Sequence, residues 1–197
     1  MVNMKYVPIL KWKAAEIGAL YDLRDTQKDI VAPVFEFVRP LSISEKDERN
    51  GIKSPEDKLL RILSYSMPND ILRKWGDGRL FFADFTLIFP EDLRKEFAKK
   101  FCKNSKKLHL DFIPIINISA DSASYQKDIA KLANFYASAN LCVRLNIAEI
   151  QEIDIVNLLL KQFLIANNMN CCNVSLLIDL KENVSDDIYD MAFNNTL

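Results

Sequence analysis

Residues 6–20, YVPILKWKAAEIGAL, join a short apolar run to a segment with the periodicity of a helix. The apolar run ends in Lys11 and Lys13, and apolar side chains then recur at helical spacing from Ala14 to Leu20. The stretch therefore predicts a buried strand that carries two cations to its carboxyl end, where the chain turns into a helix. This is the sequence pattern of one βα unit.

The same pattern recurs along the chain. Five further apolar runs alternate with segments of helical periodicity. We expect these strands at residues 30–39, 79–89, 110–118, 141–147 and 174–180. Such alternation predicts an α/β fold with parallel strands and right-handed crossovers. None of the four glycines builds a glycine-rich phosphate loop after a strand, so the dinucleotide-binding and P-loop motifs are absent.

Two architectures fit this alternation, an open doubly wound sheet and a TIM-barrel-like (β/α) repeat. We favour the barrel-like repeat, although about six βα units fall short of the eight that close a barrel. The 197 residues are expected to form a single domain over residues 1–197. Because the chain stops after the sixth unit, it is either a truncated piece of a longer barrel or a sheet with an open edge.

The segments between the strands carry helix and loop signals. Ser54 followed by Pro55 predicts a helix start, and Pro68 is expected to break that helix. Residues 40–51 are expected to be a loop, residues 149–168 one long amphipathic helix, and residues from 185 onward a final helix.

The composition excludes several classes of protein. Lys plus Arg number 26 and Asp plus Glu 27, so no global field draws the chain toward nucleic acid or anionic lipid. No apolar run approaches the roughly 18 residues of a membrane span, and the N-terminus lacks an apolar signal core. We therefore expect a cytoplasmic protein without membrane contact. The only histidine, His109, excludes an imidazole-rich metal site, and the four cysteines lack C-x-x-C spacing, which predicts inert thiols.

A polar residue follows the apolar residues on one face of every expected strand. Side chains alternate between the two faces of a strand, so residue parity assigns them to a face. The residues found in this way are Lys11, Glu36, Asp84, Asn117, Arg144 and Asp179. In a barrel they would surround the C-terminal mouth, where barrel enzymes have their sites. Lys13 and Glu16 belong either to this mouth or, for Glu16, to a first helical turn, where an acid suits the helix dipole.

This ring has two interpretations, a structural network of ion pairs and a binding site. In a catalytic site, Lys11 and Arg144 would hold a phosphate or carboxylate, and Glu36 or Asp179 would act as general base. The candidate catalytic residues are Lys11, Glu36 and Asp179, and the candidate ligand-binding residues are Lys13, Asp84, Asn117 and Arg144. No cofactor is predicted, although the three carboxylates at Glu36, Asp84 and Asp179 also suit Mg²⁺.

The N-terminal residues resemble a known family. The pattern P-x-L-K-x-K-x-x-E-x-x-A-L falls on Pro8, Leu10, Lys11, Lys13, Glu16, Ala19 and Leu20, and a P-V-F-E segment follows at residues 33–36. The sequence thus resembles the phage and bacterial beta protein family. The resemblance implies a TIM-barrel-like protein of phages, prophages and neighbouring defence islands, without an established activity. Family members are longer, so the chain resembles their N-terminal two thirds or less.

Three functions follow as hypotheses. The first is an interaction protein of phage or anti-phage defence biology that binds a protein partner, for which an open sheet edge is suited. The second is a hydrolase or lyase that acts on a small anionic, phosphorylated ligand at the mouth. The third and weakest is nucleic-acid binding by a lysine-rich helix at residues 95–107.

Overall fold

The computed structural model describes residues 6–137 and 139–179. Within these residues, six strands form one sheet in the order β1-β2-β3-β4-β5-β6, and every neighbouring pair is parallel. The strands are β1 (Ile9–Lys11), β2 (Val34–Glu36), β3 (Phe81–Asp84), β4 (Phe112–Ile116), β5 (Leu141–Asn146) and β6 (Val174–Asp179). The sheet curls into a half-barrel with alternating helices, so the expected incomplete, TIM-barrel-like α/β fold is confirmed.

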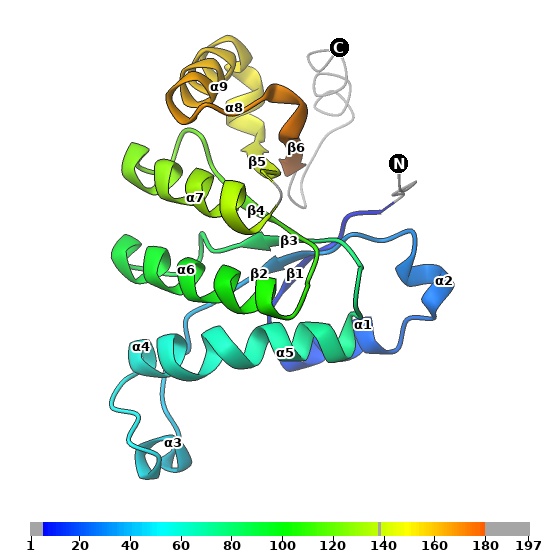
Figure 1. The fold of residues 1–197 in the computed structure, drawn as a ribbon, viewed down its shortest axis with the longest axis vertical. Helices are drawn as coiled ribbons and strands as arrows, with labels where there is room; N and C mark the ends of the chain where they lie inside the picture. The colour runs from blue at the N-terminus through cyan, green and yellow to red at the C-terminus, as the bar shows by residue number, and fades with distance from the viewer. Residues whose placement is uncertain (1–5, 138, 180–197) are drawn as a thin grey trace.

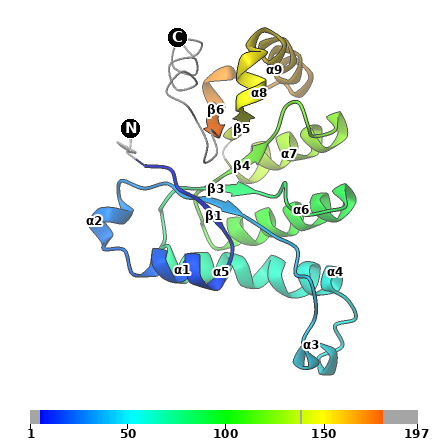
Figure 2. The ribbon, with the colours of Figure 1, turned by 180° about the vertical axis from the view of Figure 1, so that it is seen from behind.

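Helices connect the strands, and the longer ones cover the outer face of the sheet. They are α1 (Ala14–Tyr21), α2 (Asp25–Lys28), α3 (Glu45–Arg49), α4 (Pro55–Lys58), η1 (Leu59–Leu63, a π-helix), α5 (Ser64–Lys74), α6 (Glu91–Lys107), α7 (Ala123–Tyr136), α8 (Ile147–Gln151), α9 (Ile153–Asn167) and η2 (Cys171–Asn173, a 3₁₀-helix). In Figure 1 the helices α5, α6, α7 and α9 stack in chain order beside the sheet. Figure 2, from behind, shows the same stack and α3 projecting away from it.

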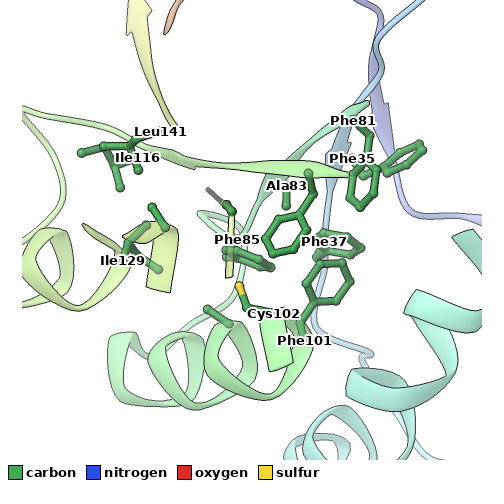
Figure 3. Close-up of a cluster of buried hydrophobic side chains, with 14 of the residues drawn as sticks. Phe35, Phe37, Phe81, Ala83, Phe85, Phe101, Cys102, Ile116, Ile129 and Leu141 are labelled. Carbon is green, nitrogen blue, oxygen red and sulfur yellow. The ribbon is translucent and has the colours of Figure 1, made fainter. Parts of the chain in front are cut away.

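The larger core lies between the sheet and these helices. It contains a cluster of aromatic side chains, and Phe37, which directly follows β2, belongs to this cluster (Figure 3). The ring of Phe37 is 4.6 Å from that of Phe101 on α6 and 5.5 Å from that of Phe85. Burying an aromatic side chain of this size contributes about 1.5–3 kcal/mol, so this cluster fixes the helices to the sheet.

A second, smaller core lies on the concave face of the sheet. It consists of Ala32, Val34, Phe82, Ile113, Ile115 and Cys142. These residues have the parity that the sequence assigned to the face with polar ends. The next residue of this face on β2 is Glu36, on β3 Asp84 and on β5 Arg144. The apolar layer thus supports the polar mouth from below.

The break expected at Pro68 is wrong, because α5 continues through this residue. Proline has no N–H, so the carbonyl of Ser64, four residues earlier, loses its helical donor. The side chain of Asn104 on α6 supplies the missing donor, with its Nδ2 3.0 Å from the Ser64 oxygen. The helix ends at Lys74, and Gly76 follows with a φ of +110°, which favours glycine.

Other boundaries also differ from the expectation. Residues 40–51 contain α3, because Ser44 caps it and accepts from the backbone N–H of Asp47. The expected helix at residues 149–168 is divided into α8 and α9 at Glu152, whose φ of −109° and ψ of 37° are not helical. The strands are shorter than the apolar runs that contain them. The helix expected from residue 185 onward lies outside the described residues.

Candidate functional site

The guanidinium of Arg144 on β5 binds three carboxylates from three other strands. Its Nη1 donates to Oε1 of Glu36 at 2.7 Å and to Oδ2 of Asp84 at 2.6 Å. Its Nη2 and Nε donate to Oδ2 of Asp179 at 2.6 Å and 3.2 Å. We call Arg144, Glu36, Asp84 and Asp179 the Arg144 cluster. The structure thus brings together four of the residues predicted to share one mouth.

The Arg144 cluster depends on the curl of the sheet. β3 and β4 lie between β2 and β5 in the sheet order, yet the side chains of Arg144 and Glu36 meet over the concave face. In a flat sheet, β2 and β5 would be about 14 Å apart, since neighbouring strands are about 4.8 Å apart. The contact therefore couples the two halves of the half-barrel.

The Arg144 cluster is largely removed from solvent, and each of its side chains is more than four-fifths buried. Burial alone would lower the pKa of Arg144, but the hydrogen bonds to Glu36 and Asp179 and the charge of Asp84 outweigh it and raise that pKa. The guanidinium thus remains a cation. One guanidinium faces three carboxylates, which gives the cluster a formal charge of −2.

The carboxylates of the Arg144 cluster differ in how fully they are satisfied. Asp84 is completely buried, and its second oxygen, Oδ1, accepts from the backbone N–H of Thr86 at 2.8 Å and from the Thr86 hydroxyl at 2.6 Å. Glu36 uses only Oε1, and its Oε2 has no hydrogen-bond partner among the described residues. Asp84 therefore has a structural position, whereas Glu36 retains an oxygen for a ligand.

A cavity of about 920 Å³ opens above the Arg144 cluster at the C-terminal ends of the strands. Its polar lining includes Lys11, Glu36, Asn117, Arg144, Asn146 and Asp179. A cavity of this size is in the range of small-molecule sites. The polar ends of the strands thus converge on one opening, as the parity of the strands predicted.

The remaining predicted site residues lie in different places. Lys11 is exposed on the edge strand β1, in register with Glu36, and forms no ion pair with any described residue. Asn117 lines the cavity, and its Oδ1 accepts from the backbone N–H groups of Ser119 and Ala120, which fixes the loop after β4. Lys13 precedes α1 and is not among the described residues that line the cavity.

Two cavity residues, Arg94 and Asp121, do not follow from the strand pattern. Arg94 on α6 forms an ion pair with Asp121 at 2.9 Å, and its guanidinium lies 4.0 Å from the centre of the Tyr125 ring. Both charged side chains are buried. Asp121 also accepts from the backbone N–H of Asn117, and burial raises its pKa. Strand parity carries no information about Arg94, because this residue lies on a helix.

The arrangement of the carboxylates differs from that of a Mg²⁺ site. The three carboxylates that were considered as its ligands surround the guanidinium of Arg144. Among residues 6–137 and 139–179, no three or more His, Cys, Asp or Glu side chains are grouped so that they could hold a metal ion.

The comparison with protein families shows to which family the chain belongs. The family model described as Beta protein matches residues 6–195. The chain belongs to the beta protein family. No curated protein and no solved structure matches it. In this beta protein, the two segments that carry the resemblance bring Lys11 and Glu36 side by side on β1 and β2. None of the helices in the described part of the chain is long and apolar enough to cross a membrane.

Proposed function

We propose that this beta protein is a cytoplasmic interaction protein of phage or anti-phage defence biology, which binds a protein partner over the mouth of its half-barrel. The chain belongs to the beta protein family, and its resemblance to this family implies a setting in phages, prophages and neighbouring defence islands. The open edge of the sheet supports the mode of action. Within the described residues, β1 and β6 each pair with a strand on one side only.

The edge strand β1 carries the observation on which this proposal depends. A parallel edge strand presents unpaired N–H and C=O groups, which another chain can bind. Ile9 of β1 lines the cavity and is 36% exposed, although strands of parallel sheets are usually buried on both faces. An apolar side chain beside free backbone groups suits contact with a protein.

Affinity capture from phage-infected cells, with matched variants, tests the proposal. Ile9→Lys places a charge on the edge strand, and Tyr65→Lys places one on α5, at a residue that is 64% exposed and does not line the cavity. We expect one protein to be retained by the wild type and by Tyr65→Lys but lost with Ile9→Lys. Equal retention by all three proteins, or retention of nothing, would contradict an interaction through β1.

A second candidate function is that of a hydrolase or lyase on a small anionic, phosphorylated ligand. The observation that favours it is the pair of Lys11 and Glu36, which line the cavity from neighbouring strands. Lys11 would hold the anion, and Oε2 of Glu36 would accept a proton as general base.

Substrate loss from a panel of phosphorylated metabolites, followed by mass spectrometry, tests this candidate. We expect the wild type to consume a compound that Glu36→Gln and Lys11→Met leave intact, with both variants folded at the assay temperature. If both variants match the wild type, the Lys11 and Glu36 pair is not catalytic.

A further inference from the structure

Carboxylates outnumber guanidinium groups in the Arg144 cluster. Its four residues comprise one guanidinium and three carboxylates, and Lys11 is the cavity-lining cation without an ion pair among the described residues. Lys11 lies exposed on the edge strand and forms no hydrogen bond with the Glu36 carboxylate. Unbalanced charge in a largely buried site costs several kcal/mol per ion. A cationic ligand would lower this cost, whereas an anionic ligand would raise it.

Glu36 provides the acceptor for such a cation. The residue is 8% exposed, it lines the cavity, and its Oε2 has no hydrogen-bond partner among the described residues. A carboxylate oxygen is satisfied only by donors, because an ionised carboxylate is an acceptor alone. The guanidinium of Arg144 is not available to an anion in the same way, since four of its five N–H donors already bind carboxylates.

The rim of the cavity is apolar. Leu87 and Phe89, in the loop after β3, are 38% and 64% exposed and line the cavity together with Ile9. An aromatic face attracts a guanidinium or an ammonium group, and the methylene stem of arginine or lysine packs on apolar side chains. The rim and the acidic floor thus complement the two parts of one long basic side chain.

We propose that the protein partner inserts an arginine or lysine side chain into this mouth. The cationic head binds Oε2 of Glu36, and the stem lies against Ile9, Leu87 and Phe89. This inference rests on the proposed function and adds the chemistry by which the partner is recognised. It differs from the expectation that Arg144 and Lys11 hold an anion.

A titration with small probes, followed by NMR of the ¹⁵N-labelled full chain, tests the inference. The probes are N-acetyl-arginine amide, its neutral analogue N-acetyl-citrulline amide, spermidine and inorganic phosphate. We expect the arginine probe to shift resonances at the ends of β1 and β2 with a Kd of about millimolar size, and the citrulline probe to bind at least about tenfold more weakly.

Two variants localise the binding. Glu36→Gln keeps an oxygen for Nη1 of Arg144 and removes the charge, so we expect affinity for arginine to fall about tenfold. Phe89→Ala changes an exposed side chain and should weaken binding about threefold without a loss of stability. The control Glu45→Gln, whose side chain is 90% exposed on α3, should leave the affinity unchanged.

Three outcomes would overturn the inference. The first is binding of phosphate but not of the arginine probe, and the second is an unchanged affinity for the arginine probe in Glu36→Gln. The third is binding of spermidine as tight as that of the arginine probe, because the ligand would then be a free polyamine and not a side chain of a protein. The proposed function fails separately. If Glu36→Gln still captures the partner that Ile9→Lys loses, the interaction through β1 is supported. The insertion of a basic side chain of the partner into the mouth is then contradicted.

Discussion

Lys11 and Arg144 both carry a positive charge at the mouth, but their surroundings differ. Lys11 is exposed and forms no ion pair with a described residue, whereas Arg144 is largely buried among three carboxylates. Lys11→Met should change the free energy of unfolding by no more than about 0.5 kcal/mol. Arg144→Met should lower it by about 3–5 kcal/mol, because it leaves buried carboxylates without a counter-ion. Urea denaturation measures both, and a large loss in Lys11→Met would show that Lys11 is part of the ion network.

The four cysteines differ in reactivity for a related reason. Cys142 lies in the concave core, and burial raises the pKa of its thiol to about 12. Cys102 is a buried residue of α6, and burial raises the pKa of its thiol as well. Cys171 and Cys172 are exposed. Since the thiolate is the reactive form, Ellman's reagent at pH 8 should detect two fast thiols in the native protein and four in denaturant. Four fast thiols in the native protein would contradict the packing of both cores.

At the scale of residues, the sequence predicted that the members of the Arg144 cluster share one face but not the contacts among them. Parity placed Glu36, Asp84, Arg144 and Asp179 on one face, because it needs only the alternation of side chains along a strand. The loop after β3 decides which carboxylate has both oxygens hydrogen-bonded, because the backbone N–H and the hydroxyl of Thr86 donate to Oδ1 of Asp84. That contact is tertiary in origin and has no signal in the strand pattern.

At the scale of elements, α5 gives a prediction in which a second substitution restores the stability that the first one removes. Asn104→Ala removes the donor to the Ser64 carbonyl, and an unpaired buried carbonyl should cost about 1–3 kcal/mol in the free energy of unfolding. Pro68→Ala should recover most of this loss in the Asn104→Ala background, since an alanine at position 68 can supply a helical N–H. Thermal denaturation of the two single variants and the double variant measures this coupling, and additive effects would contradict it.

The elements also show where local patterns stop being informative. The cap at Ser54 is a local signal, and the helix starts there as expected. The continuation of α5 through Pro68 requires a side chain from another helix, so no local rule could supply it. The strands are shorter than their apolar runs because only paired residues count as strand, and residues such as Phe37 continue into the core beyond the pairing.

For the whole molecule, the order of strands and helices predicted the fold class, because alternation requires parallel pairing. Alternation alone does not distinguish an open sheet from a barrel, because both architectures share it. The absence of a glycine-rich phosphate loop was the feature that favoured the barrel. The curl itself becomes visible in the contact between Arg144 on β5 and Glu36 on β2, over strands that separate them in the sheet.

A double-mutant cycle between these two residues is the most direct test that the polar strand ends converge on one mouth. The variants are Arg144→Met, Glu36→Gln and their combination, and the free energy of unfolding is measured by urea denaturation. Convergence predicts a coupling energy of at least about 1 kcal/mol, because the two side chains form one buried contact. Additivity within about 0.5 kcal/mol, as is typical of residues that do not touch, would contradict it.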